Sequence, residues 1–139
     1  MNKKIFLNII MSKLSLTPAQ FNNAGTHNMN DNSSVAGYGY YSININKYSV
    51  ADIEKEWEKI LNLAKSFPGF IDGKLMFPTT PLYIHDPNNT GVFVANVVAY
   101  GRWKTNKDDH RWVEKALHNG WGFNNLHPTH KVHVTMLEK

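Results

Sequence analysis

The alternation of hydrophobic and polar residues predicts four strands. Apolar and polar residues alternate from Gly39 to Asn46, the period of a strand with one apolar and one polar face. A short apolar stretch over residues 70–77 and a longer one over residues 92–103 predict the second and third strands, joined as a long hairpin by a proline-rich loop. Residues 131–137 alternate again and predict the last strand.

A first helix is predicted over residues 50–66. Ser49 followed three residues later by Asp52 resembles a capping box, the signature of a helix start. The apolar residues that follow fall on one helical face: Ile53, Trp57, Ile60, Leu61 and Ala64. Pro68 and Gly69 then end the helix.

A second helix is predicted after the third strand. Thr105 is the expected N-cap, and Asp108 and Asp109 favour the positive helix start, with an end near Gly120. The resulting order β-α-β-β-α-β predicts an α+β fold of the ferredoxin-like kind with an antiparallel sheet.

The stretch 92–103 is apolar on both faces, whereas two helices can cover only one face of a four-stranded sheet. We therefore expect a second copy of the chain to cover the other face in a two-fold homodimer. The alternative is that the N-terminal segment or the 78–90 loop folds over it.

Residues 1–38 are polar, rich in asparagine and without a sustained period, and predict a loosely ordered extension ahead of one domain over residues 39–139. This extension is also a candidate docking arm for a partner. The apolar run 5–11 is short, contains Asn8 and lacks a convincing cleavage site, which argues against a signal peptide. No stretch is long enough to cross a bilayer, so we expect no membrane partner and a cytoplasmic location.

Composition narrows the function classes. The chain of 139 residues has no cysteine, which excludes disulfides, thiolate metal sites and cysteine nucleophiles. Its formal net charge is +4, but basic residues alternate with acidic ones, so no nucleic-acid partner is expected. The sequence contains no Ser-His-Asp elbow, glycine-rich phosphate loop or paired-carboxylate signature.

Two segments carry a resemblance to a known family. Ser66-Phe67-Pro68-Gly69-Phe70 is similar to the entry to strand two, and Tyr100-Gly101-Arg102-Trp103-Lys104-Thr105 to the strand-to-helix junction, of the antibiotic-biosynthesis monooxygenases, members of the dimeric α+β barrel superfamily. The resemblance implies a cofactor-independent monooxygenase acting on a planar aromatic or quinol-like small molecule, without metal or organic cofactor. Other members degrade haem, so a haem-binding, haem-degrading or non-catalytic barrel remains the alternative.

The resemblance places Trp103, a predicted catalytic residue, in the wall of an internal pocket, although a purely structural core role stays open. Several cofactor-free members have an asparagine four residues before this tryptophan, where this chain has Ala99. The nearest asparagine, Asn96, lies on the opposite face of the strand unless a bulge at Gly101 shifts the register.

Strand one offers a substitute for that amide. Asn44 is the predicted catalytic amide and Asn46 a predicted substrate contact, provided that their face lies against the helices rather than in solvent. The remaining predicted substrate-binding residues are Trp57, Tyr100 and Trp112.

Histidines supply the other candidates. His110 is the predicted catalytic base or, together with His118, a haem ligand, with a plain surface position as the alternative. His127, His130 and His133 recur every third residue, but they run from a loop into a strand, where that spacing does not gather them, so no metal site is predicted.

Overall fold

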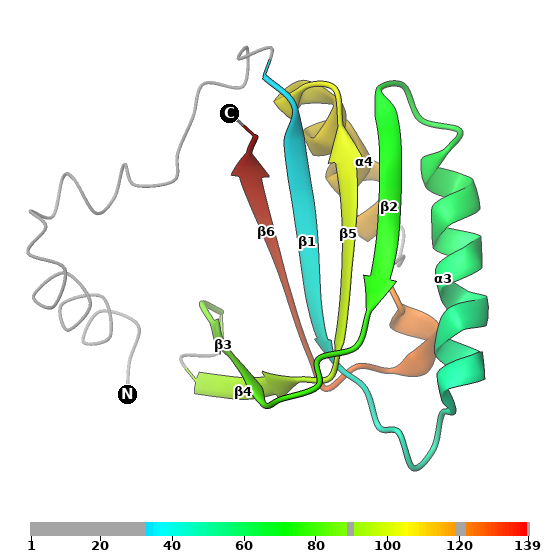
Figure 1. The fold of residues 1–139 in the computed structure, drawn as a ribbon, viewed down its shortest axis with the longest axis vertical. Helices are drawn as coiled ribbons and strands as arrows, with labels where there is room; N and C mark the ends of the chain where they lie inside the picture. Colours follow the sequence, from blue (N-terminus) through cyan, green and yellow to red (C-terminus); the bar gives the residue numbers. More distant parts are fainter. Residues whose placement is uncertain (1–32, 89–90, 119–121, 139) are drawn as a thin grey trace, which may run out of the picture.

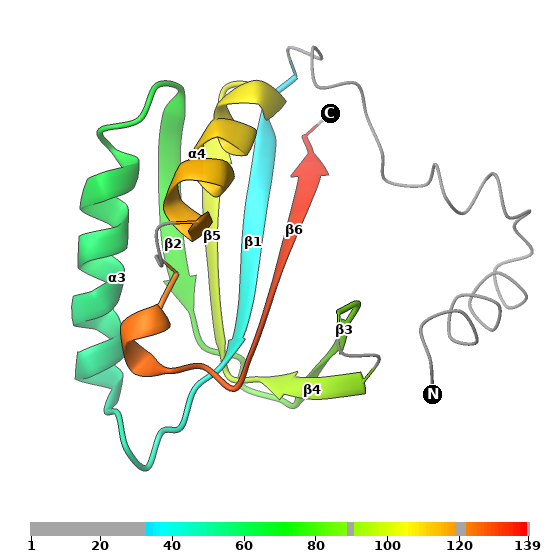
Figure 2. The same cartoon turned by 180° about the vertical axis from the view of Figure 1, so that it is seen from behind.

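The computed structural model describes residues 33–88, 91–118 and 122–138 of the protein. Its main sheet has four antiparallel strands in the order β2-β5-β1-β6, namely β2 (Phe70–Met76), β5 (Val97–Trp103), β1 (Val35–Ser42) and β6 (His130–Leu137). Two helices, α3 (Val50–Ala64) and α4 (Asn106–His118), cover one face of this sheet (Figures 1 and 2). The α+β, ferredoxin-like fold predicted from the sequence is confirmed.

Strand pairing decides which side chains face the helices. Directly paired residues share a face, and Tyr41 pairs with Val97 while Gly39 pairs with Ala99 and His133. Tyr41 and Val97 pack in the core with Ile53 of α3, so the odd-numbered residues of β1, β5 and β6 form the helix-facing side. The even-numbered residues form what we call the open face: Tyr38, Tyr40, Val98, Tyr100, Val132, Val134 and Met136.

Both helices begin at the predicted caps. The Ser49 hydroxyl accepts a hydrogen bond from the Asp52 N–H at 3.1 Å, and the Asp52 carboxylate accepts one from the Ser49 N–H at 2.9 Å. At the start of α4, the Thr105 hydroxyl accepts a hydrogen bond from the Asp108 N–H at 3.1 Å. Local sequence therefore fixes where each helix starts.

Strand β1 differs from its prediction in position. It begins at Val35, four residues before the expected start, and ends at Ser42. Asn44 accepts the Lys47 N–H through its carbonyl and the Asn46 N–H through its side chain, so the chain turns here. The predicted extension over residues 1–38 lies mostly outside the described residues and stays a prediction.

The stretch 92–103 is two strands rather than one. β4 (Gly91–Ala95) pairs with β3 (Leu82–Asp86) in a separate two-stranded sheet, and β5 starts at Val97. The expected hairpin of strands two and three is thus wrong in detail, since β2 does pair with β5 but the chain between them forms its own hairpin. This hairpin lies on the β6 side of the main sheet, away from α3 (Figures 1 and 2).

Asn96 explains the break between β4 and β5. Its side-chain oxygen accepts the Ile43 N–H at 2.9 Å, its amide nitrogen donates to the Ile43 carbonyl at 2.6 Å, and its main-chain N–H donates to the Tyr41 carbonyl at 2.9 Å. The side chain thereby takes the hydrogen bonds that a continued strand would have made. Asn96 is committed to the main chain, and the register irregularity that the sequence allowed at Gly101 lies instead in β2, between Phe70 and Asp72.

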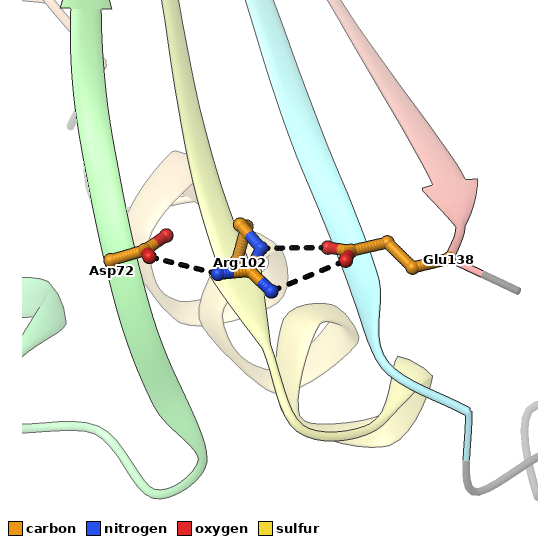
Figure 3. Close-up of polar contacts among 3 residues, drawn as sticks. All are labelled: Asp72, Arg102 and Glu138. Atoms are coloured by element: carbon orange, nitrogen blue, oxygen red, sulfur yellow. Dashed lines mark hydrogen bonds and ion pairs between the residues drawn. The ribbon is translucent and has the colours of Figure 1, made fainter.

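An ion-pair network spans the open face near one end of the sheet. Arg102 of β5 donates through Nη1 to Asp72 of β2 at 2.8 Å and through Nε to Glu138, just after β6, at 3.0 Å (Figure 3). Figure 3 shows the three side chains on the side away from α4. The network ties the two outer strands to β5 without entering the helix-facing side.

Within the described residues, no helix has the length and apolarity that a membrane span requires.

Candidate functional site

A cavity between the helices and the sheet has Gly37 and Gly101 in its floor, and a third glycine, Gly73, continues their row across the sheet. Gly73 pairs with Gly101, and Gly101 pairs with Gly37, so one row across three strands carries no side chain on either face. A Cβ on Gly73 would lie 3.3 Å from the Trp57 ring, and one on Gly101 would lie 3.3 Å from Trp103 Nε1. Aromatic rings therefore rest directly on the main chain, which only glycine permits at these distances.

Tryptophans form the walls of this space, which we call the aromatic cavity. Trp103, 1% exposed, stacks on Trp112 with ring centroids 5.6 Å apart and meets Phe70 edge-on at 5.2 Å. Trp57 of α3 lines the opposite part of the wall. The cavity volume is about 50 Å³. Such a space suits the flat face of an apolar ring more than a highly charged ligand.

Tyr41 brings a hydroxyl into the aromatic cavity. Its ring lies over Gly39, so that a Cβ there would collide with the phenol, and it meets Phe123 edge-on at 4.9 Å. Burial raises the pKa of Tyr41 to about 12. At neutral pH the phenol therefore keeps its proton and can donate a hydrogen bond to an oxyanion in the cavity.

An imidazole and a carboxylate meet at the edge of the same floor. A Cβ on Gly37 would lie 2.6 Å from Asp109 Oδ1 and 3.0 Å from His133 Cε1, so both side chains crowd the same point. Asp109, 2% exposed, accepts a hydrogen bond from the Thr135 hydroxyl at 3.0 Å through Oδ2, while Oδ1 has no hydrogen-bond partner. A buried carboxylate oxygen without a partner is costly and is a recognised mark of a functional group.

Although only Asp109 is buried and His133 is exposed as a residue, loss of contact with water shifts the pKa of both groups toward their neutral forms. It raises the pKa of Asp109, and the nearby His133, Thr135 and His110 counteract this by favouring the carboxylate. Displacement of water from its ring lowers the pKa of His133, and the charge of Asp109 opposes that shift. His133 is therefore predominantly neutral at pH 7 and has a nitrogen available to accept a proton.

The structure does not bring the two predicted amides to the aromatic cavity. Asn44 and Asn46 lie beyond the end of β1, are exposed, and are absent from the lining of the aromatic cavity. The strand ends at Ser42 because the Asn96 side chain caps the main chain of Ile43, so the expected alternation does not continue to these asparagines.

Most of the predicted aromatic residues line the aromatic cavity. Trp57, Trp103 and Trp112 line the aromatic cavity. Tyr100 borders it as well, but its ring packs at a tilt against Tyr38 of the open face, with ring centroids 5.5 Å apart. Ala99 also lines the cavity, so no amide occupies the position that the family resemblance singles out.

The predicted histidine base is misplaced. His110 is exposed on α4 and does not line the aromatic cavity, which leaves the haem alternative without that ligand. The side chain of His118 lies outside the described residues. Of the other three, His127 is exposed, His130 stacks on Phe93 at 4.8 Å, and His133 alone lines the cavity. Among the described residues, no three His, Asp or Glu side chains gather as metal ligands would.

Sequence reasoning missed Tyr41, Asp109 and His133. Asp109 carried the signal of a first-turn acid at a helix N-terminus, which accounts for Asp108 but not for its buried neighbour. His133 alternates with Val132 and Val134, and the pattern did not say which of the two faces meets the helices; the valines belong to the open face. The Gly37 and Gly39 pair in β1 was the available signal, because glycine in a strand marks a close approach.

A short loop beside α3 borders the aromatic cavity through Gly122 and contains the 3-10 helix η1 (Asn124–Leu126). Phe123 lies in this loop with φ 63° and ψ 16°, stacked on Trp57 at 6.5 Å. Such a left-handed backbone costs a non-glycine residue about 1–2 kcal/mol. Asn125 of the same loop donates to the buried Glu56 carboxylate at 2.8 Å, which anchors the loop to α3.

Solved structures share this fold at low sequence identity. SnoaB, a cofactor-independent oxygenase from Streptomyces nogalater, matches with a TM-score of 0.54 at 10% identity, over 77% of this chain and 94% of its own. An antibiotic biosynthesis monooxygenase from Nitrosomonas europaea gives 0.53 at 14% identity, over 78% and 92%. The protein has the fold of the antibiotic-biosynthesis monooxygenases.

The same antibiotic-monooxygenase fold also occurs in MhuD, a haem degrader from Mycobacterium tuberculosis crystallised with two haems in its active site, with a TM-score of 0.52 at 14% identity, over 75% and 94%. No family profile and no curated protein sequence matches the chain. At these identities the likeness establishes the antibiotic-monooxygenase fold, and the chemistry has to be argued from the cavity.

Proposed function

We propose that the protein is a cofactor-independent monooxygenase that oxygenates a planar, mostly apolar aromatic or quinol-like small molecule. One observation carries the proposal. The aromatic cavity joins a flat glycine floor and a tryptophan wall to a protonated phenol, Tyr41, and a neutral imidazole, His133. The wall holds an apolar ring, and the two polar groups face the place where its oxygen substituent would lie.

In this reaction the protein positions the substrate and transfers its proton. A substrate with an acidic hydroxyl or an activated CH₂ loses a proton, and its anion passes one electron to dioxygen. The substrate radical and superoxide combine to form a hydroperoxide on the substrate carbon that is oxidised. That carbon still carries one hydrogen, so loss of water from the hydroperoxide leaves a ketone. One oxygen atom enters the product and the other leaves as water, so CH₂ plus O₂ becomes C=O plus H₂O.

Tyr41 suits the role that an amide would otherwise play. Ala99 offers no polar group, but Gly39 pairs with Ala99 in the same row of the sheet, and the Tyr41 ring lies over Gly39. The Tyr41 hydroxyl is thus placed to donate to the substrate oxyanion. Because a donor aimed at developing charge is worth about 3 kcal/mol in other enzymes, Tyr41→Phe should lower kcat about 100-fold.

The size of the cavity limits the substrate. Its volume of about 50 Å³ is smaller than the roughly 150 Å³ that holds benzene in an engineered apolar cavity. Binding of one ring therefore requires the wall to move. Trp57 is only half-buried, and its partner Phe123 belongs to a short loop, so this side of the wall is where we place the movement.

Oxygen uptake with a panel of anthrones and quinols tests the proposal. We expect uptake with at least one member, and a fall in kcat/KM of about tenfold in Trp103→Phe, which shrinks the wall. Tyr83→Phe, on the exposed side of the β3–β4 hairpin, is the matched aromatic control and should behave as wild type. Absence of uptake by folded protein across the whole panel would reject the oxygenase assignment.

The active form of this enzyme is a homodimer formed through the open face. The side chains there are apolar and have no helix over them, with Val134 37% exposed and Met136 47% exposed. Tyr38 stacks on Tyr40 and packs at a tilt against Tyr100 on the same face, which makes a contiguous aromatic surface. Such a surface is covered most simply by the same surface of a second copy.

A further inference from the structure

His133 borders two cavities at once. It lines the aromatic cavity, and it also lines a second cavity of about 280 Å³ at the outer edge of β6, which we call the edge cavity. The other residues of the edge cavity are Tyr41, Pro87, Asn88, Lys131 and Val132. A proton taken up on one side of the imidazole can therefore leave on the other, because imidazole has two nitrogens.

Asp109 stands behind this imidazole. Its Oδ1 and the His133 ring crowd the same point above Gly37, and Oδ1 has no hydrogen-bond partner. Thr135 holds the other oxygen, Oδ2, at 3.0 Å, which fixes the direction of the carboxylate. A fixed carboxylate beside an imidazole stabilises the imidazolium that forms when the ring accepts a proton.

The remaining charged groups around the pair are few. His110, next to Asp109 on α4, acts on the carboxylate from the outside. Lys131 lies on the same face of β6 as His133, but its Nζ donates to Asn124 Oδ1 at 2.8 Å. Tyr41 of β1 also lies near the pair, and its phenol is neutral at pH 7 because its pKa is about 12. Asp109 is thus the group placed to stabilise a charged His133.

We propose that His133 is the catalytic base that removes the substrate's proton in the aromatic cavity and releases it into the edge cavity, with Asp109 as its positioning residue. The substrate O–H bond breaks, its electron pair stays on the substrate oxygen, and an N–H bond forms on the ring. The imidazolium then gives the proton from its other nitrogen to water in the edge cavity. This assignment rests on the proposed oxygenase function, but the ionisation step is observable without oxygen.

Binding of 4-nitrophenol under nitrogen is the test, because its anion is yellow and its neutral form is not. With the full-length protein below the ordinary pKa of the dye, we expect bound dye to show the anion band in wild type. His133→Gln should bind the dye but reduce the band about tenfold or more, and Asp109→Asn should reduce it by a smaller factor. His127→Asn is the matched control, an exposed histidine outside both cavities, and should keep the band.

Titration of the His133 ring by long-range ¹H–¹⁵N NMR is the second arm. We expect a pKa below the ordinary 6.5 in wild type, since displacement of water lowers it, and a further fall in Asp109→Asn, since the carboxylate raises it. An ordinary His133 pKa that Asp109→Asn leaves unchanged would overturn the pairing. A dye that binds wild type in its neutral form, or that fails to bind, would overturn the base assignment. Ionisation of bound dye without oxygen uptake on any panel member would keep this inference and reject the oxygenase.

Discussion

Asp109 Oδ1 occupies the space that a side chain on residue 37 would need, since a Cβ built on Gly37 would lie 2.6 Å from it. The same Cβ would lie 3.0 Å from the His133 ring. Glycine at position 37 is therefore what allows a helix carboxylate and a strand imidazole to approach each other. The pair depends on the absence of a side chain as much as on its own two residues.

Gly37→Ala should separate the pair without removing either charged group. The methyl pushes Asp109 away from His133, so the pKa of His133 falls further and the acid limb of the pH–rate profile moves to lower pH. Overpacking should also cost about 1–3 kcal/mol of stability in urea unfolding. Gly101→Ala, in the same row but against Trp103, is the control that should cost stability and leave the acid limb in place.

Tyr41 should make the fold sensitive to alkali. Its pKa is ordinarily near 10 and is raised to about 12 by burial, so the folded state holds this proton more tightly than the unfolded chain does. The corresponding stability is fully present below pH 10 and is lost as pH rises to 12, by roughly 3 kcal/mol at 1.36 kcal/mol per unit. Urea unfolding of wild type and Tyr41→Phe at pH 9 and pH 12 measures it; equal losses in both proteins would show that Tyr41 is not responsible.

The loop over the aromatic cavity should depend on the contact between Glu56 and Asn125. Glu56 is buried and its carboxylate accepts the Asn125 amide at 2.8 Å, with Lys59 at 3.6 Å as the other neighbour. A double-mutant cycle with Glu56→Ala and Asn125→Ala should give a coupling free energy of about 1.5–3 kcal/mol, the range for hydrogen bonds to charged groups. Strict additivity of the two substitutions would mean that the contact does not anchor the loop.

A charge on the open face should disrupt the homodimer. Met136→Glu places a carboxylate on the open face, and sedimentation velocity should show a monomer where the proposed wild-type form is a dimer. Ile45→Glu is the control, because Ile45 is 64% exposed in the turn after β1 and away from the open face. Wild type that sediments as a monomer at all concentrations would remove the dimer from the proposal.

How far the sequence predicts this fold depends on the range of the interaction involved. Ser49 and Thr105 cap helices through contacts three residues away, and both were predicted. The break at Asn96 depends on Ile43, 53 residues distant, and an uninterrupted apolar pattern concealed it. Short-range hydrogen bonds can be recognised from residue types at a fixed spacing in the sequence, whereas long-range ones cannot.

The residues of the candidate site also differ in how well the sequence predicts them. Trp57, Trp103 and Trp112 were found because large aromatic residues on apolar faces are visible in the sequence. His133 was missed because the face of β6 that meets the helices is set by pairing with β1, and the more apolar alternation of Val132 and Val134 belongs to the open face. With both faces of a sheet partly apolar, hydrophobic pattern alone does not say which one holds the cavity.

Asn96 acts as a surrogate peptide unit: its amide offers one acceptor and one donor to Ile43, as a neighbouring strand would. The hydrogen bonds of the Ile43 main chain are thus satisfied by the Asn96 side chain and do not depend on the conformation of β4. The β3–β4 hairpin is thereby uncoupled from the register of the sheet. Its length can change by insertion or deletion while the glycine floor and the strands that carry it keep their alignment, which makes the hairpin a natural graft point in this scaffold.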